Sequence, residues 1–315
     1  MSFSKKLTYL LYKIFNEVFI KANRKNLYGD IVFSKNNIKL EAPALILFDF
    51  SHPTTHLGDR LFFAPLIFEL CGLGFKILLS KEDKITKSLF NELKNSIVLG
   101  EHNGDTHVDL VVIPSPSLLA FRSKYLNTPT VICQFTLIKK QSILAELAQA
   151  FSQITNRTIG SLALSESCVG LQSNLLRKND KYFLFSNYID SGWFRKFFLN
   201  ITCLEEQAVR LRNDGFKIIH VGSSRDLAGD KNNYEFIDID LRGVLSVAEL
   251  VCLANTKEVV GAVTYDNVIM HLIGIFDKRA LVLFRGRFLK SNRALHYAFI
   301  NPVFFKQDNK IEYLQ

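Results

Sequence analysis

Cysteine, tryptophan and proline are scarce in this chain of 315 residues, at five, one and seven copies. The cysteines stand singly, without the short paired spacings of zinc sites or disulfide frameworks, which argues against both and favours a reducing compartment. Acidic residues are also in deficit, at 30 against 39 basic ones, so the formal net charge is +9. That charge favours an acidic partner such as a nucleotide, a nucleic acid or an anionic membrane surface.

Long apolar runs are absent as well. No stretch approaches the roughly 20 apolar residues that a transmembrane helix needs, so we expect a soluble or peripheral protein. Hydrophobic residues make up 48% of the chain and charged residues 22%, a composition typical of globular proteins rather than disordered ones. The length suits two hydrophobic cores of about 100–200 residues each.

The N-terminal segment has the strongest helical periodicity. Apolar residues recur at steps of three and four from Leu7 to Ala22, and lysines and arginines surround this stripe. Lys13 and Glu17 interrupt the run that a secretory signal would need. Two interpretations stay open: the helix lies on an anionic bilayer, or its stripe packs on the protein's own core or a second subunit.

Short apolar runs alternate with helical segments along the rest of the chain, without an internal repeat. This alternation predicts an α/β protein with parallel sheets covered by helices, whose functional residues follow the carboxyl ends of the strands. An irregular stretch at 156–180 is expected to link two such halves. We expect strands at 44–50, 76–79, 109–113, 130–133, 182–187, 216–221, 259–263 and 280–284, the last of these ending the sheet, and helices at 61–73, 203–213, 246–253 and 267–276.

The segment 260–272 is the most informative for function. An apolar strand leads to a short turn with Asp266, and an apolar helix containing His271 begins directly afterwards. Free backbone N–H groups and the helix dipole make such a helix start a site for anions. Asp266 also suits a helix cap, and His271 equally suits an ordinary buried histidine. Further upstream, Ser246 and Glu249 have the spacing of a capping box.

One motif around Gly58 and Asp59, followed by a second from Leu241 to Phe284, resembles the signature of glycosyltransferase family 9, the lipopolysaccharide heptosyltransferases. Sequences of the family contain Gly-Asp followed by a proline near the N-terminus. Further along they contain a Leu-x-Glu-Leu helix, a strand, the motif Asp-Thr-Gly-x-x-His and a strand ending in Leu-Phe-Gly. The matching residues are Gly58, Asp59 and Pro65, then Leu241, Gly243, Ser246, Glu249, Leu250, Val260, Gly261, Asp266, His271, Leu272, Lys278, Leu283 and Phe284.

The resemblance implies two Rossmann-like parallel-sheet domains that face each other across a cleft (the GT-B fold), with an N-terminal amphipathic extension. We expect the extension at 1–40, an acceptor-binding domain at 41–178 and a nucleotide-sugar-binding domain at 179–315. The implied activity is metal-independent, inverting transfer of a sugar from a nucleotide diphosphate such as ADP-heptose to a lipopolysaccharide core or another bacterial surface saccharide. No cofactor is expected.

The resemblance also assigns roles to individual residues. Asp59 matches the proposed base, although a carboxylate that caps its helix is the plainer interpretation. Gly58, Arg60 and His56 are expected near the acceptor. The residues expected to hold the donor are Asp266, Asn267, Val268, His271, Lys196, Arg195, Asp226 and Ser223; for Lys196 and Arg195 a solvated basic turn, and for Asp226 a loop carboxylate, are the alternatives.

Several positions depart from the family pattern. Asn267 and Val268 replace Thr-Gly, so a small hydroxyl and a residue that permits close backbone approach are both missing. Asp277 replaces a glycine, and Arg279 and Arg285 are added arginines suited to gripping phosphate. These changes point to a different donor sugar or to lost activity.

The sequence therefore predicts a cytoplasmic glycosyltransferase that contacts the inner membrane through residues 3–25. One rival is a catalytically inactive scaffold of the same fold in surface-polysaccharide assembly. The other rival is a nucleic-acid-binding protein, suggested by the charge of +9, for which no recognition motif is present.

Overall fold

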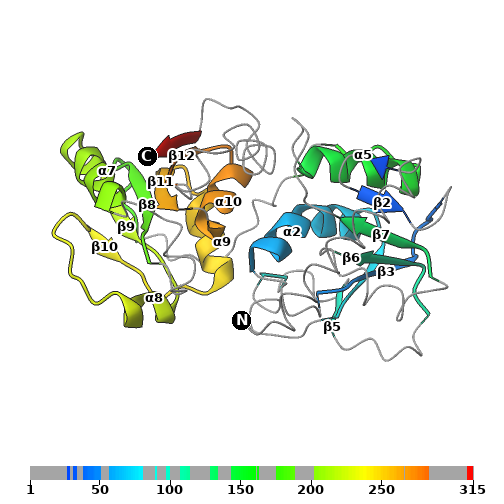
Figure 1. Ribbon diagram of the computed structural model, residues 1–315. Coiled ribbons are helices and arrows are strands. Elements are labelled where there is room, and N and C mark those ends of the chain that lie inside the picture. The colour runs from blue at the N-terminus through cyan, green and yellow to red at the C-terminus, as the bar shows by residue number, and fades with distance from the viewer. Residues whose placement is uncertain are drawn as a thin grey trace, which may run out of the picture. The chain divides into compact units, whose positions relative to one another are not determined.

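The computed structural model divides into two compact units, Met1–Leu162 and Ala163–Gln315 (Figure 1). Each unit is built on its own sheet. The structure describes residues 27–28, 31–33, 38–50, 57–80, 89–90, 97–99, 107–113, 128–133, 143–160, 162, 175–188, 202–265, 267–283 and 311–314.

The C-terminal unit contains a six-stranded sheet in the order β10-β9-β8-β11-β12-β13, and every pairing is parallel. Numbered along the chain within this unit, the order is 3-2-1-4-5-6, the arrangement of dinucleotide-binding Rossmann domains. The strands are β8 (Tyr182–Ser186), β9 (Lys217–His220), β10 (Ile239–Asp240), β11 (Val259–Tyr265), β12 (Arg279–Leu283) and β13 (Ile311–Leu314).

Helices cover both faces of this sheet. On one face, α7 (Thr202–Asn213) buries Leu204, Ala208 and Leu211 in a core with residues of β8, β11 and β12. On the other face lie α9 (Val247–Asn255) and α10 (Val268–Ile275), which pack on β11 and on each other. Both faces are covered, so the strands are continuous apolar runs.

The N-terminal unit has a seven-stranded sheet in the order β1-β2-β7-β6-β3-β4-β5. Its last five strands are parallel in the order 5-4-1-2-3 of their own sequence, whereas β1 and β2 are antiparallel additions at one edge. Helix α2 (Leu57–Gly72) follows β3 and contacts both β4 and α5 (Ile143–Thr155). The strands are β1 (Leu27–Tyr28), β2 (Ile31–Phe33), β3 (Leu45–Phe48), β4 (Lys76–Leu79), β5 (Ile97–Leu99), β6 (Leu110–Ile113) and β7 (Thr130–Cys133).

Two parallel-strand α/β sheets confirm the predicted fold class. The structure differs from the expected element list at the edges. The chain adds β13 after β12, which we expected to be the last strand, and the antiparallel strands β1 and β2 lie within the stretch predicted to be an extension. The predicted amphipathic helix from Leu7 to Ala22 lies outside the described residues.

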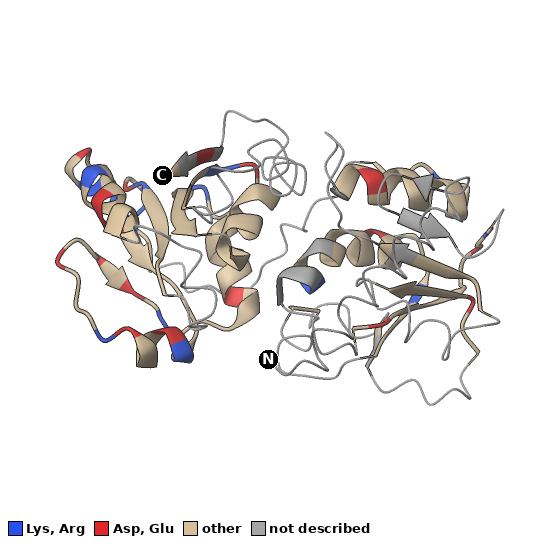
Figure 2. Ribbon diagram, viewed as in Figure 1, with Lys and Arg blue, Asp and Glu red and all other residues tan. Residues whose placement is uncertain are grey.

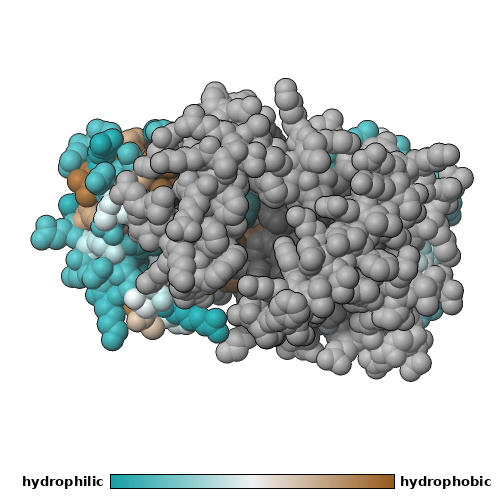
Figure 3. All heavy atoms as spheres, in the orientation of Figure 1, coloured by the Kyte–Doolittle hydropathy of each residue, from teal (hydrophilic) through white to brown (hydrophobic). Residues whose placement is uncertain are grey.

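Charged and apolar residues are segregated in the C-terminal unit. Lysine, arginine, aspartate and glutamate lie mostly on α7, on α8 (Ser224–Gly229) and around β10, while α10 and β11 carry almost none (Figure 2). On the face shown in Figure 3 the described surface of this unit is mainly hydrophilic, with small hydrophobic spots. Among the described residues, no helix is long and apolar enough to span a membrane.

Candidate functional site

The order of the C-terminal sheet marks one place for a ligand. Strands β9 and β10 lie on one side of β8, whereas β11, the next strand along the chain, lies on the other side of β8. Ligands of such sheets bind beyond the carboxyl ends of the strands, at the point where the order reverses. In this unit that point lies between the ends of β8 and β11, next to the start of α10.

Asn267 joins the two strands at this point. Its Oδ1 accepts the hydroxyl hydrogen of Thr264 at 3.0 Å, from β11, and its Nδ2 donates to Oγ of Ser186 at 3.2 Å, at the end of β8. The same Oδ1 also accepts the backbone N–H groups of Ile269 at 2.9 Å and Met270 at 3.4 Å. Asn267 is therefore the N-cap of α10, a role that we had considered for Asp266, which lies outside the described residues.

His271 and Val268 lie on the first turns of α10. His271 is half-buried, and burial lowers the pKa of its imidazole to about 3, so the ring is neutral at pH 7. A neutral imidazole donates one hydrogen bond and accepts one, whereas it brings no positive charge to a phosphate. Any contact of His271 with a donor would therefore be a hydrogen bond rather than an ion pair.

The loop after β9 carries the predicted donor residues Ser223 and Asp226. Both are already used in a capping box at the start of α8. The Ser223 side chain accepts the backbone N–H of Asp226, and the Asp226 carboxylate accepts the backbone N–H and the hydroxyl of Ser223. Ser223 is exposed and Asp226 is half-buried, so a ligand hydroxyl would have to share the carboxylate with this cap.

The loops after β9 and β10 touch through glycines. The N–H of Gly243 donates to the carbonyl of Gly222 at 2.9 Å, and Gly243 has a left-handed φ of 72°. A Cβ on Gly243 would approach Cα of Ser224 to 3.1 Å, and one on Gly222 would approach Cβ of Asp226 to 2.8 Å. A side chain at Gly243 would therefore press on the loop after β9, and one at Gly222 would press on Asp226 at the start of α8.

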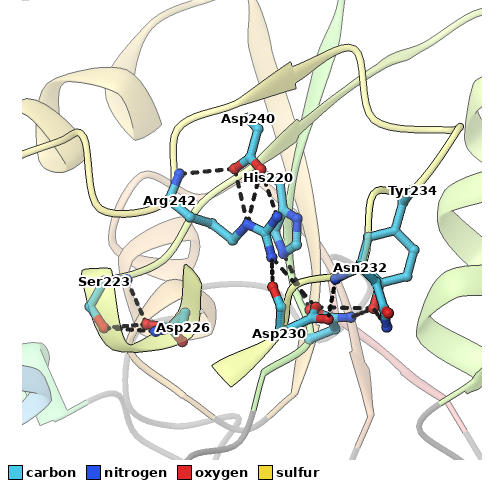
Figure 4. Close-up of polar contacts among 9 residues, drawn as sticks. His220, Ser223, Asp226, Asp230, Asn232, Tyr234, Asp240 and Arg242 are labelled. Atoms are coloured by element: carbon cyan, nitrogen blue, oxygen red, sulfur yellow. Dashed lines mark hydrogen bonds and ion pairs between the residues drawn. The ribbon is translucent and has the colours of Figure 1, made fainter. Parts of the chain in front are cut away.

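A buried polar network that the sequence did not reveal lies behind these loops (Figure 4). Arg242, 5% exposed, donates from Nη2 to Asp240 at 2.6 Å and from Nη1 to the carbonyl of Asp230 at 2.7 Å. The network continues through the hydroxyl of Tyr234, which donates to the Asp230 carboxylate at 3.0 Å and accepts from Asn187 at 2.8 Å. Only the contacts of Arg242 with Asp240 are local enough for sequence spacing to suggest them.

His220 completes this network at the end of β9. Asn187 donates through its Nδ2, so its Oδ1 must accept, and His220 Nε2, 3.2 Å away, carries the hydrogen. The ring is 1% exposed, and burial together with the nearby Arg242 cation lowers the pKa of His220 to about 4. Nδ1 of this neutral ring is a buried acceptor without a hydrogen-bonding partner.

The N-terminal unit has a corresponding reversal between β3 and β6. Asp49, directly after β3, accepts the hydroxyl of Ser80 from the end of β4 at 2.9 Å. Gly58 and Asp59 lie in the first turn of α2, the helix that follows β3. Arg60 is only 2% exposed, so its predicted contact with an acidic acceptor does not fit the structure. The other predicted acceptor residue, His56, lies outside the described residues.

Four further residues were predicted to bind phosphate. Lys196, Arg195 and Arg285 lie outside the described residues. Arg279 begins β12 at the amino end of the strand and pairs with Glu312 at 3.2 Å, so our expectation that it grips phosphate is wrong. Among the residues that the structure describes, no three His, Cys, Asp or Glu side chains are grouped to hold a metal ion.

Solved structures share this architecture. A family 9 glycosyl transferase from Veillonella parvula DSM 2008 has a TM-score of 0.60 and 14% identity, covering 89% of this chain and 88% of that one. The chain has the fold of the family 9 glycosyltransferases. E. coli ADP-heptose lps heptosyltransferase II follows at a TM-score of 0.53 and 12% identity, covering 86% and 90%.

E. coli heptosyltransferase WaaC, solved with ADP, has a TM-score of 0.51 and 11% identity, covering 85% of this chain and 92% of that one. No protein-family profile matches the sequence, and no curated protein matches it. The likeness therefore concerns the fold, over 85–89% of this chain.

Proposed function

We propose that the protein is a glycosyltransferase that moves a sugar from a nucleotide diphosphate donor to a saccharide acceptor. The observation that supports this most directly is the polar end of the C-terminal sheet at its point of reversal. There Ser186, Thr264 and Asn267 meet beside the start of α10, in a fold shared with family 9 glycosyltransferases.

The donor would bind over the carboxyl ends of β8, β9 and β11. Its nucleoside would lie along the loops that begin at Gly222 and Gly243, and its diphosphate would point to the start of α10. The N–H groups of Ile269 and Met270 at this helix start already donate hydrogen bonds to Oδ1 of Asn267. Donor binding at these amides would therefore displace the Asn267 carboxamide, with Asp266, His271, Lys196 and Arg195 as further proposed contacts.

The acceptor half of the reaction would use the N-terminal unit. An acceptor hydroxyl oxygen attacks the anomeric carbon from the face opposite the diphosphate, so one carbon–oxygen bond forms while the bond to the diphosphate breaks. We assign the released hydroxyl proton to the Asp59 carboxylate, which is supported by its motif match and its place in the first turn of α2. Attack from the opposite face inverts the anomeric configuration.

The proposed donor is ADP-heptose or a related nucleotide sugar. Support comes from the sequence resemblance and from the structural neighbours, of which one is an ADP-heptose lps heptosyltransferase and another was solved with ADP. The proposed acceptor is a lipopolysaccharide core or another bacterial surface saccharide. We place this transfer at the cytoplasmic face of the inner membrane, where the basic segment 3–25 would hold the protein.

A scaffold without catalytic activity is the second candidate, and Asn267 favours it. In the resembled motif a threonine and a glycine open this helix. Here an asparagine caps the helix amides and β-branched Val268 follows, which blocks close approach of a diphosphate to the backbone. A protein of this kind would bind a nucleotide sugar, or an assembly partner, without turnover.

Binding and turnover separate the two candidates. ADP, UDP, GDP and ADP-heptose are added one by one, and the midpoint of thermal unfolding is measured, because a ligand that binds only the native state raises it. We expect ADP and ADP-heptose to raise the midpoint. If none of the four nucleotides shifts the midpoint, the transferase is wrong, and so is a scaffold that binds a nucleotide sugar.

Transfer is then measured with ADP-heptose and deacylated lipopolysaccharide core, following release of ADP. We expect Asp59→Asn to lose at least about 100-fold in rate, the lower range for removal of a general base. Glu69→Gln, an exposed carboxylate on the same helix, is the matched control and should keep the rate. Full activity of Asp59→Asn would refute the base, and binding without transfer by the unmodified protein would favour the scaffold.

A further inference from the structure

The network around Arg242 has no part in the proposed chemistry, yet it lies in the same part of the unit as Ser223 and Asp226, two residues expected to hold the donor (Figure 4). We propose that Arg242 is a positioning residue that fixes the two nucleotide-binding loops against the end of the sheet. The proposal rests on the proposed function for the identity of the ligand. It does not depend on that function for the mechanical role of the arginine.

Arg242 connects segments that the chain otherwise leaves separate. Its Nε donates to both carboxylate oxygens of Asp240 at 3.0 and 3.1 Å, which locks the loop after β10 to the end of that strand. Its Nη1 reaches Asp230, the C-cap residue of α8, through a carbonyl at 2.7 Å and a carboxylate at 3.5 Å. One guanidinium thus joins the start of the segment between α8 and α9, at Asp230, to the end of β10, at Asp240.

The loops that face the proposed donor are held by this anchor. Gly243, the next residue, donates to the carbonyl of Gly222 and packs on Ser224. We therefore expect a shift of Arg242 to move Gly243 and to reach the loop after β9 through this hydrogen bond and the contact with Ser224. Local contacts also hold these loops, namely the capping boxes at Ser223 and Ser246 and the buried Leu241, whose N–H donates to the carbonyl of His220 at 2.8 Å. Val244, in contrast, is 67% exposed, and α8 buries no residue of its own.

The anchor also extends toward the start of α10. Asp230 contacts Tyr234, Tyr234 contacts Asn187, and Asn187 directly follows Ser186, which accepts the amide of Asn267. Arg242, His220 and Asn187 are 5%, 1% and 6% exposed, so none of them offers its side chain to a ligand. Their influence on a nucleotide must pass through the backbone that they hold.

Arg242 is suited to this task by its chemistry. The guanidinium presents five donors in a rigid plane and stays charged when buried, whereas a lysine offers one compact ammonium group. Its partners compensate the charge: burial raises the pKa of Asp240, but the hydrogen bonds and charge of Arg242 outweigh this and leave it below its usual range. Loss of the arginine would leave two carboxylates beside the buried ring of His220.

The first test compares Arg242→Gln with Arg279→Gln. Arg279 is the matched control because it also pairs with a carboxylate of the same sheet, at the opposite, amino end of the strands. Hydrogen exchange is measured without nucleotide. We expect Arg242→Gln to speed exchange of the amides at 222–224 and 243–246 and to leave α7 unchanged, whereas Arg279→Gln changes neither loop. Unchanged exchange in both loops of Arg242→Gln would overturn the anchoring role.

The second test measures the dissociation constant for ADP by calorimetry. We expect Arg242→Gln to weaken binding about tenfold or more and Arg242→Lys to recover part of the loss, because the lysine restores charge without the planar fork. Leu211→Ala, a buried side chain on α7, controls for lowered stability and should bind ADP like the unmodified protein.

The two proposals fail in different ways. An unmodified protein that binds no nucleotide contradicts the proposed function, while the exchange measurement still tests the anchor. A folded Arg242→Gln protein that binds ADP as tightly as the unmodified protein contradicts the positioning role alone. If Arg242→Gln does not fold, Arg242→Lys replaces it, because the lysine keeps the charge but lacks the planar fork that reaches both Asp240 and Asp230. Wild-type loop exchange and affinity in Arg242→Lys would then overturn the proposal.

Discussion

Replacing Asp277 by glycine should stabilise the protein. Asp277 follows the last residues of α10 with a left-handed φ of 55°, and the next two helix-ending hydrogen bonds form a complete Schellman motif. The N–H of Asp277 donates to the carbonyl of Gly274 at 3.1 Å, and that of Lys278 to the carbonyl of Ile273 at 3.1 Å. The family that the sequence resembles has glycine at this position.

The expected gain follows from three contributions, of which two favour glycine and one opposes it. A left-handed conformation costs an ordinary residue roughly 1–2 kcal/mol, whereas glycine gives back about 0.4–1 kcal/mol through the greater freedom of the unfolded chain. The aspartate also places a negative charge at the negative end of the helix dipole, at a cost of about 0.3–1 kcal/mol. We therefore expect Asp277→Gly to raise the free energy of unfolding by about 1 kcal/mol.

Gly215 offers the reciprocal substitution. It closes α7 with the same pair of hydrogen bonds and a φ of 91°, and a Cβ placed on it would meet nothing within 4 Å. Gly215→Asp therefore changes backbone strain without a steric clash, and from the same contributions with opposite sign we expect a loss of about 1 kcal/mol. Asp277→Asn separates the charge from the conformation, because asparagine tolerates the left-handed region.

Urea denaturation of the four proteins measures these differences, and the slope of the transition shows whether the unfolded state has changed. In a unit of this size, 1 kcal/mol corresponds to about 2–4 °C in the thermal midpoint. A lower stability of Asp277→Gly, with Gly215→Asp destabilised as expected, would refute the reasoning. It would show that contacts of the Asp277 side chain outweigh the strain of its backbone.

Three further predictions concern buried groups. The fold depresses the pKa of His220 from 6.5 to about 4, so the unfolded chain takes up the proton first, and this histidine should contribute about 3 kcal/mol to the fall in stability as the pH drops through that window. His271, whose pKa is also lowered, adds its own contribution to the same fall. Denaturation measured at several pH values should show a smaller fall for His220→Gln and an unchanged one for His107→Gln, whose side chain is 90% exposed. Lys278 donates to two carbonyls at the end of α9, at 2.5 and 2.6 Å, so Lys278→Met should cost about 1–3 kcal/mol in urea denaturation. A Cβ on Gly261 would lie 2.4 Å from a carbonyl of β12, so Gly261→Ala should lower the thermal midpoint by the equivalent of about 1–3 kcal/mol, while Gly72→Ala, with open space around it, should not lower it.

Local patterns in the sequence predicted much of the fold. The buried strands β4 and β7 begin and end where their apolar runs predict, because a strand covered on both faces needs apolar residues throughout. The capping box of Ser246 and Glu249 is present at the start of α9, since both of its hydrogen bonds close within three residues. Such features depend on neighbours along the chain.

Short strands were harder to predict. Strands β1, β2, β5 and β10 contain two or three residues each and carry no periodicity of their own. Each forms because a neighbouring strand offers hydrogen bonds, as β9 does for β10. The information that defines these strands is therefore held by their partners in the sheet.

The sequence by itself determined the class of fold, the helix that begins after β11 and the resemblance that suggests a nucleotide-sugar donor. Only the tertiary structure decided that Asn267 meets Ser186, 81 residues earlier in the chain, and that Arg242 is buried among carboxylates. Both outcomes depend on strand order, because the reversal of the sheet brings the ends of β8 and β11 together. Periodicity and capping are local interactions, whereas the contacts that build the candidate site form only when the sheet is complete.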